Sequence, residues 1–230
     1  MNFNDYLALP DGTMSLYTNG FESLHGPAMI VLQEIFGVNS NIRKTVDRLA
    51  GKGYRAVAPD LFWRQRPGVD LNPADAEDRA VAMSLAQAYR ESLAAGIADL
   101  VALVAKLRVK HSKIGLVGYC LGGRVAFQGW LSLDVDAVVS YYGVGIDTLL
   151  GDIPAGRSPL LMHLGAEDPL NPPAVQVAIV AALAGRDEAR VDIHPGVGHA
   201  FARIDGASYV ADAAERADAA TFEFLSTHLK

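Results

Sequence analysis

Short apolar segments recur along the chain, and the segments between them carry the periodicity of amphipathic helices. The apolar segments comprise residues 28–32, 55–58, 114–117, 137–141 and 160–164. Runs of this kind are typical of strands that are covered on both faces. Between the first two runs, Ile42, Val46 and Leu49 recur at helical spacing, and Asn39 or Ser40 is suited to cap that helix. Strands that alternate with helices predict an α/β fold with a mostly parallel sheet, which binds ligands at the carboxyl ends of its strands.

The rest of the chain extends this alternation. Residues 6–9 and 14–18 predict an edge hairpin around a Pro-Asp-Gly turn, and residues 59–72 are irregular. Asn72-Pro73 predicts the start of a helical stretch that reaches Leu107 and breaks near residues 89–92. The predicted apolar face of that stretch consists of Leu93, Ile97, Leu100, Val101 and Val104. The last predicted elements are a helix over 173–184, a strand over 190–194 and a helix with Phe222, Leu225 and Leu229 on one side. We expect a single domain over residues 1–230, with helices on both faces of the sheet.

The segment KIGLVGYCLGGRVAF, residues 113–127, joins the predicted strand 114–117 to a predicted helix over 124–131. Its glycines flank Cys120 at the spacing Gly-x-Cys-x-Gly, which matches the Gly-x-Ser-x-Gly nucleophile elbow with sulfur in place of the hydroxyl. The helix N-terminus favours a thiolate at this position. The alternative, a structural cysteine beside a glycine turn, does not require this spacing between a strand and a helix. The pattern therefore predicts that Cys120 is a nucleophile.

A sulfur nucleophile needs a base, and a neutral imidazole needs a carboxylate that orients it. The loop after strand 160–164 contains Glu167 and Asp168, and the loop after strand 190–194 contains His199. The order nucleophile, acid, histidine is the order of the α/β-hydrolase fold. Spacing alone does not choose between the two carboxylates. His194 is a competing base, but it lies within a predicted strand. For the oxyanion hole, this fold uses the N–H groups that here belong to Leu121 and Ile35.

Composition excludes several other kinds of protein. The net charge of −6 and the pI near 5.5 argue against a nucleic-acid partner. No apolar stretch is long enough to span a bilayer, and the N-terminal residues lack the pattern of a secretory signal. The one cysteine cannot form an internal disulfide, which fits a cytoplasmic location. The histidines show no metal-ligand spacing, and we expect neither a metal nor a cofactor.

Six motifs are spread over nearly the whole chain: QEIFGVN (33–39), APDLFWRQRPG (58–68), GLVGYCLGG (115–123), YYGVG (141–145), GAEDPLNPP (165–173) and GHAFAR (198–203). Together they resemble the dienelactone hydrolases, or carboxymethylenebutenolidases. A cysteine elbow combined with the glutamate of QEIFG is far more specific than an elbow alone. The resemblance implies an α/β-hydrolase fold without a separate cap domain.

The resemblance also implies roles for individual residues. It implies a triad of Cys120, Asp168 and His199, and thereby selects the acid. It further implies that Glu34 contacts the thiol, as a resting-state partner or as a base. Arg79 and Arg203 would hold the carboxylate of a dienelactone, and hydrolysis through a thioester would give maleylacetate. Phe36 and Tyr141 are further candidates to line the substrate site, although each is equally suited to the core.

Two alternatives remain open from the sequence. The same triad could serve a carboxylesterase with a broader or different substrate range, and the stretch around Arg79, DRAVAMSLAQAY, has small residues where the resemblance leads us to expect aromatic ones. A non-catalytic protein that binds a small lactone is the third interpretation. In each case the partner is a small molecule, and we expect a monomer or a weak homo-oligomer.

Overall fold

The computed structural model describes residues 3–19 and 26–229 and, within them, one eight-stranded sheet of order β1-β2-β4-β3-β5-β6-β7-β8. The strands are β1 (Asp5–Leu9), β2 (Gly12–Asn19), β3 (Ala28–Leu32), β4 (Arg55–Pro59), β5 (Ile114–Tyr119), β6 (Ala137–Tyr141), β7 (Leu160–Gly165) and β8 (Ala189–His194). Strands β3 to β8 are parallel, whereas β1 and β2 form an antiparallel edge hairpin. The predicted α/β fold, mostly parallel, is therefore confirmed.

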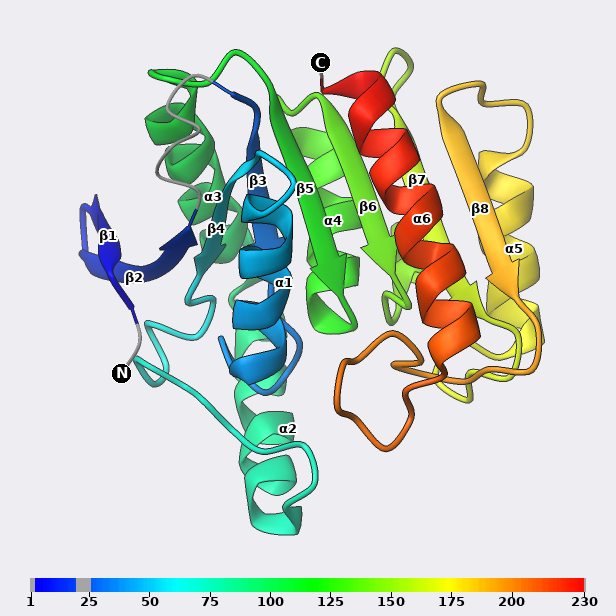
Figure 1. Cartoon of the computed structure of the whole chain (residues 1–230), viewed down its shortest axis with the longest axis horizontal. Helices are drawn as coiled ribbons and strands as arrows, with labels where there is room; N and C mark the ends of the chain where they lie inside the picture. The colour runs from blue at the N-terminus through cyan, green and yellow to red at the C-terminus, as the bar shows by residue number, and fades with distance from the viewer. Residues whose placement is uncertain (1–2, 20–25, 230) are drawn as a thin grey trace.

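Helices cover both faces of the sheet (Figure 1). One face carries α1 (Ser40–Ala50) and α6 (Ala211–His228), and the other carries α3 (Leu93–Arg108), α4 (Leu121–Ser132) and α5 (Pro173–Leu183). Helix α2 (Ala76–Glu91) projects from the edge at which β5, β6 and β8 end, and a short 3-10 helix, η1 (Ile146–Leu149), follows β6 (Figure 1). The loop over residues 195–210 lies at the same edge (Figure 1).

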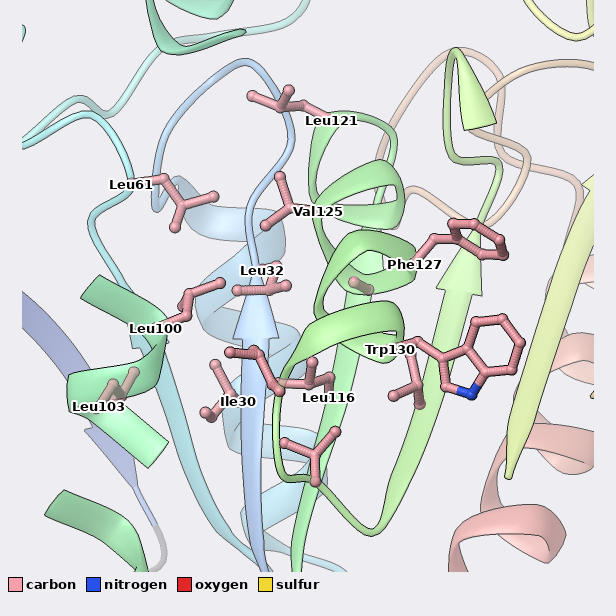
Figure 2. Packing of buried hydrophobic residues seen from close by; sticks show 14 of the residues in the cluster. Ile30, Leu32, Leu61, Leu100, Leu103, Leu116, Leu121, Val125, Phe127 and Trp130 are labelled. Atoms are coloured by element: carbon pink, nitrogen blue, oxygen red, sulfur yellow. The ribbon is translucent and has the colours of Figure 1, made fainter. Parts of the chain in front are cut away.

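The apolar segments fix this arrangement because every residue of β3, β5, β6 and β7 is buried. Figure 2 shows Val125 of α4 meeting Leu32 of β3, while Leu100 and Leu103 of α3 pack beside Ile30. Burial of each such side chain stabilises the fold by about 1.5–3 kcal/mol. The central strands therefore hold their carboxyl ends, and the loops that follow them, in a well-defined place.

Two predicted helix starts were wrong. Asn72-Pro73 forms a turn, and α2 begins at Ala76 because the side chain of Asp75 caps it by accepting hydrogen bonds from the N–H groups of residues 77 and 78, each at 2.9 Å. The helix after the elbow begins directly at Leu121 rather than at residue 124. Elsewhere the predicted N-cap of α1 is confirmed as Asn39, and the predicted break falls at Ser92, between α2 and α3. Val101 is 52% exposed and does not belong to the buried face of α3.

Candidate active site

Cys120 occupies a strained turn between β5 and α4. Its backbone has φ 54° and ψ −112°, a conformation that a residue with a Cβ rarely adopts. The turn is possible because Gly118 and Gly122 approach other backbone atoms closely: a Cβ on Gly118 would overlap the carbonyl oxygen of Gly122, and a Cβ on Gly122 would overlap that of Leu32. The two glycines of the predicted elbow are thus required by the packing of α4 against β5 and β3.

The candidate oxyanion donors lie on the two segments that this packing brings together. Leu121 is the first residue of α4, and Ile35 follows β3. In the described part of the chain, neither backbone N–H makes a hydrogen bond. Cys120 itself is 7% exposed, and the N-terminus of α4 contributes partial positive charge beside its sulfur. Free N–H groups next to a nucleophile are the donors that an oxyanion needs.

Asp168 and His199 form a hydrogen bond, from the imidazole Nδ1 to a carboxylate oxygen at 2.8 Å. The carboxylate also accepts from the N–H of Leu170 at 2.8 Å and from Nδ2 of Asn171 at 3.1 Å. Burial raises the pKa of Asp168, but these hydrogen bonds outweigh burial and hold the pKa below its usual value. Glu167, the competing acid, is exposed.

The other ring nitrogen of His199, Nε2, is buried and has no hydrogen-bond partner among the described residues. Burial lowers the pKa of His199, but the Asp168 hydrogen bond and the neighbouring Cys120 sulfur outweigh it and raise that pKa to about 10. The imidazole is therefore positioned to remain protonated beside the sulfur at neutral pH. His194, the competing base, instead lies 3.1 Å from a ring nitrogen of His163.

Glu34 and Arg203 form a buried ion pair with two hydrogen bonds. Nε of Arg203 donates to one carboxylate oxygen at 2.7 Å, and Nη2 donates to the other at 3.0 Å. The guanidinium lies 5.2 Å from the centre of the Phe36 ring. Burial lowers the pKa of Arg203, but the charge of Glu34 outweighs it and raises that pKa. The predicted thiol partner and the predicted carboxylate clamp thus contact each other, and the charge of Arg203 interacts with Cys120.

The two tyrosines of the YYGVG motif point to different environments. Tyr141, the predicted substrate residue, is fully buried, and its hydroxyl bonds to Asp218 at 3.0 Å and to Thr221 at 2.7 Å, both on α6. Tyr142, which sequence reasoning missed, has φ 39° and a ring centre 5.2 Å from that of His199.

The hydroxyl of Tyr142 is buried without a hydrogen-bond partner in the described chain. Burial raises the pKa of this hydroxyl well above its usual value, and the charge of Glu34 adds to the effect. The motif itself was the available signal, but a strand that is buried on both faces gives no periodicity that selects one tyrosine over its neighbour.

Arg79 lies on the exposed surface of α2. Its Nη2 donates a hydrogen bond of 2.7 Å to the carbonyl oxygen of Pro73, in the turn before the helix. None of its described contacts is to the triad or to the Glu34–Arg203 pair. Of the two arginines that the sequence suggests for a substrate carboxylate, only Arg203 has a described interaction with Cys120.

The described residues contain no group of three or more His, Cys, Asp or Glu side chains arranged to hold a metal ion. Nor does any described helix combine the length and the apolar character that crossing a bilayer requires.

Comparisons with known proteins identify the family of the chain. The model of the dienelactone hydrolase family matches residues 15–229. The carboxymethylenebutenolidase of Pseudomonas putida is 39% identical over 203 residues, which cover 87% of this chain and 85% of that protein. The carboxymethylenebutenolidase 1 of Cupriavidus pinatubonensis is 32% identical over 203 residues, which cover 87% of this chain and 86% of that protein.

A solved structure shows the same fold at lower identity. The dienelactone hydrolase of Anabaena variabilis superimposes with a TM-score of 0.67 at 17% identity, and the match covers 100% of this chain and 99% of that one. The family model and the alignments to the curated relatives each extend over most of the sequence. The chain is therefore a hydrolase of carboxylic esters or lactones and belongs to the dienelactone hydrolase family.

Proposed function

We propose that this enzyme opens a carboxylated dienelactone, carboxymethylenebutenolide, to maleylacetate through a thioester on Cys120. The observation that carries the proposal is the 2.8 Å hydrogen bond between Asp168 and His199 beside a cysteine on a strained elbow. The relatives that are named carboxymethylenebutenolidases support the choice of substrate.

The mechanism that we propose begins from a protonated His199 beside the sulfur that attacks. The raised pKa of His199, about 10, supports this thiolate–imidazolium arrangement. The thiolate attacks the lactone carbonyl, and the oxygen of the tetrahedral intermediate binds the N–H groups of Ile35 and Leu121. The ring C–O bond then breaks, and the enolate that departs takes up the proton of His199.

Acylation prepares the second half of the reaction. A thioester carries no negative charge on sulfur, so the interaction that raised the pKa of His199 is lost and the neutral imidazole becomes a base. It removes a proton from water, and the resulting hydroxide attacks the thioester carbonyl. The C–S bond breaks, the acid product leaves, and the proton on His199 again faces a thiolate.

Glu34 and Arg203 supply the recognition of the substrate carboxylate. Nε and Nη2 of the buried guanidinium both donate to Glu34, so a substrate carboxylate that pairs with these two nitrogens takes the place of that side chain. The displaced Glu34 is then free to turn away from Arg203. The Phe36 ring lies within cation–π distance of the same guanidinium.

A carboxylesterase of broader range is the second candidate. It is favoured by the position of Arg79, whose guanidinium is exposed and bonded to Pro73. It is also favoured by the small side chains of Ala82 and Ala86 on the buried side of α2. With one arginine rather than two beside the nucleophile, the binding advantage of a carboxylated substrate over a neutral ester is smaller.

One pair of substrates distinguishes the two candidate functions: the dienelactone and its primary amide, which lacks the carboxylate but keeps the lactone. We expect kcat/KM for the free acid to exceed that for the amide by about tenfold or more, the value of one charge-assisted pair. Equal values would support the broader esterase. Failure of the enzyme to hydrolyse either compound or a neutral aryl ester would favour a lactone-binding protein.

A further inference from the structure

Asp60 is a fully buried carboxylate that the mechanism does not use. It follows β4 directly, and no Lys, Arg or His of the described residues forms an ion pair with it. One carboxylate oxygen accepts from the N–H of Phe62 at 3.1 Å, and the other accepts from the N–H of Gly68 at 2.7 Å. The buried carboxylate therefore holds together the two ends of the loop over residues 61–68.

The loop that Asp60 closes runs beside the segment that carries Ile35. The N–H of Leu61 donates to the side-chain oxygen of Gln33 at 3.1 Å, and the N–H of Leu71 donates to the carbonyl of Phe36 at 3.0 Å. Next to the second of these hydrogen bonds, Gly37 pairs with Asp70 in an isolated bridge. Residues 61–71 thus contact the segment 33–37 on both sides of Ile35.

We propose that Asp60 is a positioning residue for the oxyanion hole: its carboxylate fixes the 61–71 loop, and the loop fixes the backbone of residues 33–37, which carries the N–H of Ile35. The inference rests on the proposed role of that N–H in ester hydrolysis. Oxyanion donors act only when they are held in place before the reaction, and the segment 33–37 belongs to neither a helix nor a strand. The 61–71 loop supplies the rigidity that this segment lacks.

A carboxylate is better suited to this position than an amide. It accepts at both oxygens, whereas an asparagine would present an NH2 group to one of the two N–H donors. Burial raises the pKa of Asp60, the two backbone hydrogen bonds lower it, and the result is a pKa of about 6. The carboxylate therefore stays ionised at neutral pH, and burial of this charge lowers the stability of the fold. A buried charge without a counter-ion is unusual for a group that only closes a surface loop.

Asp60→Asn is the first test, with two reactions of the same sulfur as readouts. Hydrolysis of 4-nitrophenyl acetate passes through an oxyanion, whereas alkylation of Cys120 by iodoacetamide displaces iodide without forming one. We expect kcat and kcat/KM for hydrolysis to fall together by about tenfold or more, because a displaced oxyanion donor weakens transition-state binding. Alkylation should stay within about twofold of wild type.

Gln33→Met is the second variant, which releases Leu61 from the other side of the loop and removes only one hydrogen bond. It decides the question if Asp60→Asn does not fold. The inference holds if hydrolysis falls at least five times more than alkylation in the folded variant. It is overturned if the two reactions fall by similar factors, or if neither falls. A wild-type enzyme that is alkylated but hydrolyses no ester would instead contradict the proposed function.

Discussion

The triad and the Glu34–Arg203 pair lie at one edge of the sheet, but they are held in different ways. Asp168 is fixed by three donors from its own and a neighbouring loop, and His199 keeps one ring nitrogen free. Glu34 and Arg203 satisfy each other with two hydrogen bonds. Under the proposed mechanism, this difference means that the catalytic groups are already in place before substrate binds, whereas Arg203 must exchange Glu34 for the substrate carboxylate.

The largest effect is expected at the nucleophile. Cys120→Ala should lower kcat on the dienelactone by about 10⁴-fold or more, since the covalent route is lost. Cys120→Ser should also lose most activity on the dienelactone, while gaining on simple esters. Steady-state assays of both variants on both substrates provide the measurement, and wild-type turnover by the serine variant would refute the role of sulfur.

The next largest effect is expected at the orienting acid. Asp168→Asn keeps the shape but removes the charge that holds the imidazole, and kcat should fall by about 10³–10⁴-fold. The pKa of His199 should also fall from its value of about 10, because one of the interactions that raise it is lost. Titration of the His199 ring protons by NMR measures this shift. Glu167→Gln, at the exposed neighbouring carboxylate, is the matched control and should leave both quantities unchanged.

The same imidazole makes stability depend on pH. The folded pKa of His199, about 10, lies above the unfolded value of about 6.5, so its contribution is full below pH 6.5 and is lost as the pH rises through 10. Urea unfolding should show a free energy that declines over this window. His199→Gln should flatten the decline, and an unchanged slope in that variant would contradict the interaction.

A smaller and opposite pair of effects is expected at the recognition groups. Glu34→Gln leaves Arg203 without its charged partner and frees it for substrate, so KM for the free acid should fall by about tenfold. KM for the amide should stay the same. The unfolding free energy should fall by several kcal/mol because a buried cation has lost its counter-ion. If KM for both compounds changes equally, the pair does not select the carboxylate.

The smallest effect is expected at Arg79. Arg79→Ala should raise KM for the free acid by less than about fivefold and leave the amide unaffected, because its guanidinium must first leave the carbonyl of Pro73. The neighbouring exposed arginine of the same helix, Arg90, offers a control variant. A large loss at Arg79 would show that α2 moves onto the site when substrate binds.

Much of the fold could be predicted because single segments encode it. The apolar run 28–32 matches β3 in full, and Asn39 caps α1 as its side chain suggests. The start of α2 was misplaced because Asn72-Pro73 and Asp75 are both plausible caps, and only the hydrogen bonds of Asp75 select the second. Local patterns carry no information about such competition.

The candidate site could be predicted only where chain order and loop position sufficed. The elbow at Cys120 and the loop residues Asp168 and His199 follow from strand ends. The contact between Glu34 and Arg203 joins side chains 169 positions apart, and no spacing rule predicts it. Tyr142 was missed for a related reason: which of two adjacent tyrosines faces His199 depends on the backbone turn at the end of β6.

The central claim is that the sulfur of Cys120 carries the acyl group. Because the chain has one cysteine, the mass of the intact protein reports its modification without ambiguity. One equivalent of iodoacetamide should add one carboxamidomethyl group and abolish dienelactone turnover in proportion to the modified fraction, with substrate slowing the reaction. An enzyme that is fully modified and still turns over the lactone at its original rate would contradict the account.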